Sequence, residues 1–347
     1  MAGTYDLRGY RFDAETFLPR ELFDRITDTR VSRPGVAAEE ARTRSRRSAL
    51  TRDGKLAILA ADHPARMVVG VGDDPVAMGN RWHLLARIAR VITADEFDGL
   101  MTTPDILDDL LILNRLDREL GGPGFLDDKV LIGCMNRGGL AGAAFELDDR
   151  MTAFTTPQIA ARGLDGAKVM FRLDVADRAS LDTMMYCVQA VNECHAHGIP
   201  VFLEALMVQR QDGKITMLRT PDALIKVVSV ASGLGASSAL TWLKIPYCEG
   251  YERVALSTTC PILMLGGESR GDPTGILTEF AAGMRAGGAV RGALVGRNVT
   301  FPGKDDPQAV ALAVHAIVHR GFTAEDAAAY LSEVRGRGAD RFSRLIA

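Results

Sequence analysis

Four charged side chains stand out within largely apolar segments of this 347-residue chain. They are Asp62 in LAILAAD, Lys168 in AKVMFRL, Glu204 in PVFLEAL and Lys244 in TWLKIPY. An ionised group that is buried without a partner is costly, so each of these charges needs a partner or a function. Two amines and two carboxylates in such surroundings have the chemistry for covalent catalysis combined with proton transfer.

Lys244 is the most informative of the four because Leu243 and Ile245 flank it. In a strand its side chain therefore points to the face opposite to theirs. A desolvated lysine near other cations has a lowered pKa, and its free amine attacks a carbonyl to form a Schiff base. The alternative is a lysine that extends to solvent or pairs with a carboxylate for structural reasons.

The other three charges also have two interpretations each. Glu204 is either a catalytic base or the partner of a strand lysine, and Lys168 either lowers the pKa of Lys244 by repulsion or neutralises Glu204. Asp62 either orients a substrate hydroxyl and transfers protons, or belongs to the Pro-containing turn that follows it.

Glycine-rich turns and two arginines form a second group of candidates. LGGES contains Gly266 and Gly267, and VGRN contains Gly296 and Arg297. Glycines let backbone N–H groups approach a ligand, and a guanidinium matches phosphate oxygens, although glycine also serves tight turns. Arg137 in MNRGG either contacts a substrate carboxylate or phosphate, or stabilises its own loop.

The elements that must position these residues alternate along the chain from Lys55 onward. Apolar runs alternate with longer amphipathic segments, which predicts strand-helix units with a parallel sheet. The predicted strands are 56–62, 97–102, 129–135, 167–173, 200–206, 241–247, 261–267 and 292–298. The predicted helices are 75–91, 104–119, 156–163, 179–197, 221–234, 249–257, 273–287 and 305–319.

Eight such units predict a (β/α)8 barrel, the TIM-barrel fold, rather than an open sheet. No G-x-G-x-x-G motif follows the first strand to indicate a dinucleotide-binding half. In this barrel the catalytic groups come from the carboxyl ends of the strands, and the loops after strands 7 and 8 commonly bind phosphate. Gly266, Gly267, Gly296 and Arg297 therefore predict a phosphate site.

The rest of the chain is predicted to surround this barrel domain, residues 51–335. Residues 1–50 form an N-terminal helical extension with an amphipathic stretch at 15–26, and residues 336–347 form a C-terminal tail. The basic run at 42–47 is interpreted as a solvated helix face, with contact to a phosphorylated partner as the alternative. A hairpin is expected around Asp212-Gly213.

Composition excludes several classes of protein. A net charge of −3 excludes a strongly basic nucleic-acid binder, and the chain has no run of 18 apolar residues that would span a membrane. Five cysteines without a C-x-x-C pair argue against a disulfide framework and favour a reducing, cytoplasmic location. No histidine pair with a third ligand stands at strand ends, so we expect no catalytic metal and no cofactor. A homo-oligomer is expected.

With Lys244 in WLKIPY, AADHP in the first strand, and GGES and VGRN after the last two, the chain resembles the class I (Schiff-base) aldolases of the DhnA type over about residues 55–320. That family includes archaeal-type fructose-bisphosphate, tagatose-bisphosphate and sulfofructose-phosphate aldolases. The resemblance implies that Lys244 forms the Schiff base, with Asp62, Lys168 and Glu204 as the other catalytic groups. It places phosphate binding at Gly266, Gly267, Gly296 and Arg297.

The chain departs from the family pattern in three ways. Glu268, Ser269 and Arg270 follow the two glycines where the family often has Pro-Lys, which leaves the phosphate contacts open. The tyrosine acid of archaeal members has no counterpart in AKVMFRL or PVFLEAL, so the resemblance names no proton donor. Strand 7 lacks the second lysine of deoxyribose-phosphate aldolases, and that activity therefore ranks lower.

The resulting hypothesis is a lyase of carbohydrate metabolism that cleaves a phosphorylated ketose or keto-acid to dihydroxyacetone phosphate and an aldehyde. The candidate substrates are a hexulose bisphosphate, sulfofructose phosphate, and the deoxy-keto-gluconate phosphate of inositol catabolism. Cleavage of the last leaves malonate semialdehyde, and Arg137 is the cation that we expect to meet its carboxylate. The rival hypotheses are a phosphate-binding barrel isomerase or synthase, and a non-catalytic sugar-phosphate sensor.

Overall fold

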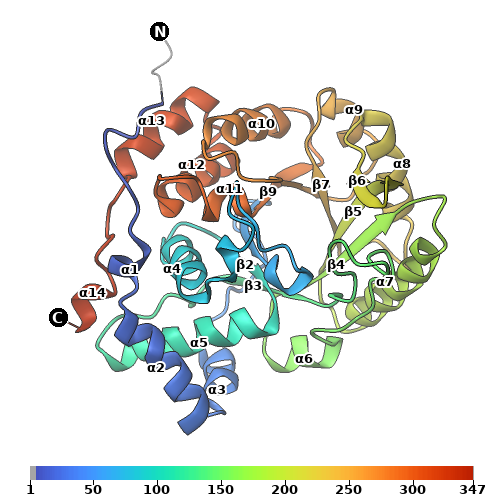
Figure 1. Cartoon of the computed structure of the whole chain (residues 1–347). Coiled ribbons are helices and arrows are strands. Elements are labelled where there is room, and N and C mark those ends of the chain that lie inside the picture. Colours follow the sequence, from blue (N-terminus) through green and yellow to red (C-terminus); the bar gives the residue numbers. More distant parts are fainter. Residues whose placement is uncertain (1–4, 347) are drawn as a thin grey trace.

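The computed structural model describes residues 5–346, and its centre is a closed barrel of eight parallel strands. Each strand pairs in parallel with its neighbours, and β4 pairs with β5 to close the ring (Figure 1). The predicted (β/α)8 barrel is therefore confirmed. Its strands are β1 (Leu56–Ala61), β2 (Gly99–Thr102), β3 (Val130–Cys134), β4 (Gly166–Leu173), β5 (Val201–Gln211), β7 (Thr241–Pro246), β8 (Ile262–Leu265) and β9 (Val290–Val295).

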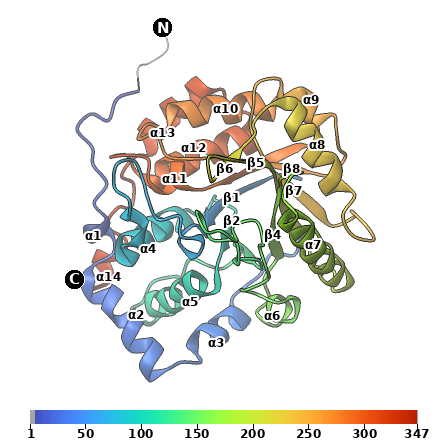
Figure 2. The ribbon, with the colours of Figure 1, turned by 45° about the vertical axis from the view of Figure 1, so that its right-hand side comes forward.

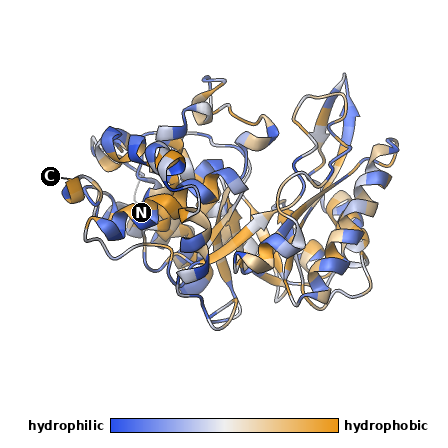
Figure 3. Cartoon of the chain, turned by 90° about the horizontal axis from the view of Figure 1, so that it is seen from below, coloured by the Kyte–Doolittle hydropathy of each residue, from blue (hydrophilic) through white to orange (hydrophobic). Residues whose placement is uncertain are grey.

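Alternation of side chains divides the apolar residues of these strands between two cores. One set points into the barrel, where Leu56, Ile58, Val130 and Phe202 form a small internal cluster. The other set packs against the surrounding helices and makes the larger core. Figure 3 shows the apolar strands enclosed by helices whose outer faces are polar. Within the barrel the strands are thus buried on both faces, which explains the near-continuous apolar runs in the sequence.

Helices lie around the barrel between successive strands (Figures 1 and 2). Pro104, Pro221 and Pro307 stand in the first turns of three of them, where proline loses no hydrogen bond. In residues 5–346 no helix has the length and apolarity needed to cross a membrane. The surrounding helices are η1 (Pro64–Arg66), η2 (Ala77–Gly79), α4 (Arg81–Ile92), α5 (Pro104–Glu119), α6 (Thr156–Ala161), α7 (Ala179–Ala196), α8 (Pro221–Ser232), α9 (Tyr251–Ala255), α10 (Thr274–Met284), α11 (Arg297–Thr300), α12 (Pro307–Arg320), α13 (Ala324–Val334) and α14 (Ser343–Ile346).

The expected hairpin extends strand β5 beyond the barrel. Strand β6 (Lys214–Met217) pairs antiparallel with the end of β5. Asp212 and Gly213 connect the two strands with φ angles of 49° and 76°. Two successive residues at positive φ are what a two-residue hairpin turn requires, and Asp-Gly is a favoured pair for it.

The N-terminal segment packs on the outside of the barrel through α1 (Ala14–Phe17), α2 (Arg20–Ser32) and α3 (Val36–Thr43). The amphipathic stretch predicted at 15–26 is divided between α1 and α2, because the chain turns at Leu18-Pro19. Phe17 is fully buried and makes an edge contact with Phe342, so the two ends of the chain meet on one side of the barrel.

The interpretation of the basic run at 42–47 as a solvated face is wrong for its most buried members. Arg44 forms an ion pair with Asp165 at 2.9 Å, and Arg47 forms one with Asp98 at 2.9 Å. Both arginine side chains are almost completely buried. The run therefore fastens the N-terminal segment to the amino ends of the barrel strands, and these arginines are unavailable to a phosphorylated partner.

Candidate active site

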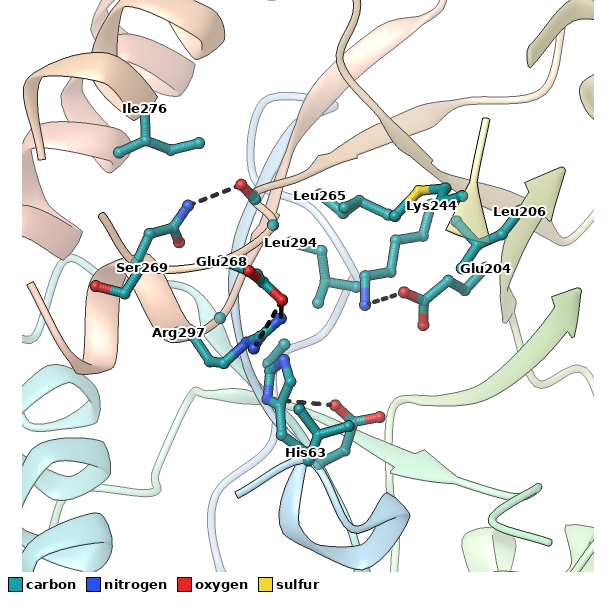
Figure 4. Close-up of a pocket in the computed structure, with 18 of the residues that line it drawn as sticks. His63, Glu204, Leu206, Lys244, Leu265, Glu268, Ser269, Ile276, Leu294 and Arg297 are labelled. Carbon is teal, nitrogen blue, oxygen red and sulfur yellow. Dashed lines mark hydrogen bonds and ion pairs between the residues drawn. The ribbon is translucent and has the colours of Figure 1, made fainter. Parts of the chain in front are cut away.

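A cavity of about 420 Å³ opens at the carboxyl ends of the strands. Its size falls in the range of about 300–1,000 Å³ that small-molecule sites occupy. Figure 4 shows Lys244 and Glu204 on one side and Arg297 with Glu268 on another. Its polar and charged lining residues are Asp62, His63, Arg66, Glu204, Arg219, Lys244, Glu268, Ser269, Arg270, Asp272, Glu279, Arg297 and Asn298.

The cavity floor contains Lys244 and Glu204 on neighbouring strands. The register of β5 and β7 places these two residues directly beside each other. The Nζ of Lys244 lies 2.8 Å from Oε1 of Glu204, and each residue is only 5% exposed (Figure 4). As predicted from its flanking residues, Lys244 points into the barrel and away from the helices.

Lys168 connects this pair to the first strand. Its Nζ lies 2.7 Å from Oε2 of Glu204 and 3.2 Å from Oδ2 of Asp62, and its side chain is completely buried. Arg137 approaches the same Asp62 oxygen at 2.8 Å. The result is a continuous chain of alternating charges, Arg137, Asp62, Lys168, Glu204 and Lys244. In this network each carboxylate lies between two cations, which offsets the cost of burying the charges.

These contacts hold both carboxylates ionised. Burial opposes the charge of Glu204, but Lys168 and Lys244 outweigh it and lower the pKa of Glu204 to about 2. Burial likewise opposes the charge of Asp62, while Lys168 and Arg137 hold its pKa well below the ordinary value. Burial also acts against the charge of Lys168, but the two carboxylates raise its pKa above the usual range. Lys168 is therefore a permanent ammonium group.

Two roles were considered for Lys168, and its contacts support the one in which it neutralises Glu204. The Glu204 carboxylate contacts Lys168 through one oxygen and Lys244 through the other. Lys168 is also absent from the cavity lining, which places it beneath the substrate space rather than beside it.

Arg137 is turned toward Asp62 and away from the cavity. One of its terminal nitrogens bonds the Asp62 carboxylate and the other the Asp62 backbone carbonyl. The loop after β3 that carries it is held further by Arg66, which contacts Asp149 at 2.5 Å and donates to the carbonyl of Asn136 at 2.7 Å. This arrangement fits the loop-stabilising alternative for Arg137, and a substrate carboxylate has to find another cation.

The predicted phosphate-binding residues gather at the opposite side of the cavity from Glu204. Gly266, Gly267, Gly296 and Arg297 all line it. Gly267 has a φ of 80°, and a Cβ there would lie 3.1 Å from the guanidinium of Arg219. The backbone conformation thus favours glycine at this position, while the Arg219 side chain would need to shift only slightly to make room for a Cβ.

Arg297 forms an ion pair with Glu268 of the same chain. The two side chains are 3.5 Å apart, with Arg297 17% exposed and Glu268 78% exposed (Figure 4). This carboxylate stands where the resemblance leads one to expect proline. A phosphate that binds Arg297 must therefore compete with an exposed carboxylate.

His63 is one of the lining residues that sequence reasoning missed. It follows Asp62 directly and packs so closely against Gly296 that a Cβ there would lie 2.6 Å from its Cε1. Burial lowers the pKa of His63 to about 4, with the neighbouring Arg297 and Lys244 acting in the same direction and Asp62 opposing them. His63 is thus a neutral imidazole at pH 7, able to donate and to accept a proton. Its place in the strand-end motif AADHP was the available signal.

The lowered pKa of His63 predicts how stability changes with pH. Between about pH 6.5 and 4 the unfolded chain takes up a proton at this histidine, but the folded chain does not. Stability therefore falls as the pH falls through this window, by at most about 1.4 kcal/mol per pH unit. We expect His63→Gln to have a shallower decline than the wild type in urea unfolding between pH 7 and 4. Parallel curves for the two proteins would contradict this.

Two further residues line the cavity, and the sequence contained little or no indication of their position there. Asn298 belongs to the VGRN segment, and its amide donates to the carbonyl of Gly266 at 2.9 Å, which joins the two glycine-rich loops. Arg219 follows the β5–β6 hairpin and enters the cavity only because of the length and path of that hairpin.

Known proteins match this chain in both sequence and structure. The family described as Cgl0159-like matches residues 54–318. A crystal structure of Cgl0159 from Corynebacterium glutamicum is 39% identical, covers 88% of this chain and 99% of its own, and superimposes with a TM-score of 0.81.

Two solved structures of lower identity have the same fold, and one further protein matches part of the sequence. A Schiff-base-forming fructose-1,6-bisphosphate aldolase is 20% identical over 82% of this chain and all of its own, with a TM-score of 0.55. An archaeal fructose-1,6-bisphosphate aldolase is 19% identical with the same coverage and TM-score. The 2-amino-3,7-dideoxy-D-threo-hept-6-ulosonate synthase 1 of Archaeoglobus fulgidus is 31% identical over 137 residues, which are 40% of this chain and 47% of that protein. The chain thus has the fold of class I aldolases, and it matches less than half the length of the synthase.

Proposed function

The chain belongs to the Cgl0159-like family, and we propose that it is a class I aldolase. In this proposal it cleaves a phosphorylated ketose or keto-acid to dihydroxyacetone phosphate and an aldehyde. One observation carries the proposal: the amine of Lys244 lies at the floor of an open cavity, 2.8 Å from the carboxylate of Glu204. A buried amine beside a proton acceptor is what imine formation requires.

Glu204 takes the proton that Lys244 must lose before it attacks the substrate carbonyl. While both lysines are charged, they hold the pKa of Glu204 at about 2. As Lys244 becomes neutral, one of these cations disappears and the proton affinity of Glu204 rises. The transfer therefore becomes easier as it proceeds, and Lys168 remains to fix the carboxylate in place.

The imine then drives carbon–carbon cleavage. The amine adds to the carbonyl, water leaves, and the protonated imine accepts the electron pair of the breaking bond. The adjacent hydroxyl loses its proton and becomes the aldehyde, while the enamine that remains is protonated and hydrolysed to release the ketone product. Glu204 and the neutral His63 are the groups in the cavity that we assign to these proton transfers.

The phosphate is assigned to the Arg297 side of the cavity. Arg297 and Arg219 supply the guanidinium groups, and glycines 266, 267 and 296 allow close approach of the backbone. The candidate substrates remain a hexulose bisphosphate, sulfofructose phosphate and the deoxy-keto-gluconate phosphate.

Borohydride trapping tests the proposal. The protein is incubated with dihydroxyacetone phosphate, reduced, digested and mapped by mass spectrometry. We expect a reduced adduct on the peptide that contains Lys244 and none in Lys244→Ala. If the wild type binds the ligand but yields no adduct at Lys244, the Schiff-base mechanism is wrong. Turnover without an adduct then supports the isomerase or synthase, and binding without turnover supports the sensor.

Arg297 and Glu268 are expected to change affinity in opposite directions. Arg297→Ala removes a charge-assisted hydrogen bond worth about 1.5–3 kcal/mol, so the dihydroxyacetone phosphate concentration that half-saturates trapping should rise about 10- to 100-fold. Glu268→Gln removes an exposed carboxylate that competes with the phosphate, and it should lower this half-saturating concentration about two- to fivefold.

Unphosphorylated dihydroxyacetone is the control ligand for this pair. Neither substitution should change its half-saturating concentration appreciably, since it has no phosphate. A shift in the same direction for both variants, or an equal shift with the unphosphorylated ligand, would place the phosphate elsewhere.

A further inference from the structure

The amino end of the barrel, opposite the cavity, carries a histidine and aspartate cluster that the proposed aldolase chemistry does not use. Asp98 directly precedes β2 and is 2% exposed. His315 and His319 stand four residues apart on α12, so they lie on the same face of the helix. Ligand-type atoms of these three residues all lie within 4.8 Å of one another.

The contacts around His319 fix the direction of both its ring nitrogens. Its Nε2 faces Oδ2 of Asp98 at 2.8 Å, and its Nδ1 faces Oδ2 of Asp53 at 2.9 Å. The ring of His315 stacks on that of His319 with centroids 4.3 Å apart. One imidazole is thus aligned between two carboxylates, with a second imidazole beside it.

We propose that Asp98, His315 and His319 form a binding site for a divalent transition cation of the Zn²⁺ class. Two imidazole nitrogens and one carboxylate oxygen are the donor set of a three-ligand zinc site with one open position. Asp53 would accept the hydrogen bond from Nδ1 of His319, which orients the ring and strengthens Nε2 as a ligand. On binding, the metal replaces the proton between His319 Nε2 and Asp98 Oδ2, and that proton goes to solvent.

One oxygen of Asp98 is engaged by an arginine, and the other, which also accepts a backbone N–H, is the oxygen that would bind the metal. Arg47 occupies Oδ1 of Asp98 at 2.9 Å, and the backbone N–H of Ala57 donates to Oδ2 at 2.8 Å. Oδ2 therefore faces His319 in a fixed position. The side chain of His319 is 13% exposed, which gives an ion access from solvent.

A metal here would join the amino ends of the first two strands to helix α12. Asp53 precedes β1, Asp98 precedes β2, and both histidines belong to α12. Because this is the amino end of the barrel, where residues serve stability rather than catalysis, the role assigned to the metal is structural. The inference is independent of the aldolase proposal and survives its failure.

Zinc titration of the chelator-treated full chain tests this site. Calorimetry with ZnSO₄ is expected to give one Zn²⁺ per chain, and a free zinc concentration 100 times the Kd should raise the Tm by about 4 °C. His315→Ala is the informative variant, because it removes one ligand and leaves the Asp53–His319–Asp98 contacts in place. We expect it to weaken zinc binding at least about tenfold, with an unchanged Tm in the absence of metal.

His83→Ala is the matched control, since His83 is a partly exposed histidine that pairs with Glu15 outside this cluster. It should bind zinc as the wild type does. Equal zinc affinity in His315→Ala and the wild type would overturn the proposal, as would the absence of a zinc-induced rise in Tm. Either result would leave His319 as a purely structural bridge between two carboxylates.

Discussion

Replacement of Lys244 by methionine is expected to slow the exchange of deuterium from solvent into dihydroxyacetone phosphate by about 10⁴-fold or more. This exchange requires an imine and then an enamine, and methionine has no amine with which to form them. Glu204 keeps its contact with Lys168 at 2.7 Å, so we expect the variant to fold. Proton NMR of the ligand in D₂O gives the rate without knowledge of the aldehyde partner.

Two matched variants separate covalent catalysis from electrostatics. Lys244→Arg preserves a positive charge beside Glu204 but forms no imine, so it should be as slow as Lys244→Met. Lys226→Met makes the same change at an exposed position of α8 and should exchange at the wild-type rate. Substantial exchange by Lys244→Arg would show that the lysine acts through its charge alone, as the isomerase hypothesis requires.

The barrel could be predicted from the sequence because its apolar pattern is local. Every predicted strand corresponds to an observed one, and the flanking Leu243 and Ile245 were sufficient to place Lys244 inside the barrel. The basic run at 42–47 was misjudged for the opposite reason. Its partners Asp98 and Asp165 lie far along the chain, and local composition contains no information about them.

The residues of the candidate site also fall into a group that the sequence could predict and a group that it could not. Residues carried by strands, such as Glu204 and Lys244, could be named because strand parity determines where a side chain points. Side chains that depend on loop paths could not. Arg137 reaches Asp62 because the loop after β3 folds back over the barrel, and Arg219 reaches the cavity by way of the β5–β6 hairpin. Neither path follows from the residue types in the loop.

Glu204→Gln is expected to lower both stability and activity. The glutamate separates two ammonium groups, at 2.7 Å and 2.8 Å, and its neutralisation leaves them facing each other in a buried site. Loss of one partner from a buried ion pair costs about 3–5 kcal/mol, which corresponds to a Tm lower by about 4 °C or more. Loss of the proton acceptor should also slow deuterium exchange by about 10²- to 10⁴-fold.

A second substitution separates these two effects. In Glu204→Gln/Lys168→Met one of the two opposed ammonium groups is removed, so part of the lost Tm should return. Exchange should remain slow, because glutamine still accepts no proton from Lys244. A Tm of Glu204→Gln within 1 °C of the wild type would mean that the charges are not balanced as their contacts indicate. Recovery of exchange in the double variant would mean that Glu204 serves only to compensate Lys168, and another group, with His63 the next in the cavity, would then be the base.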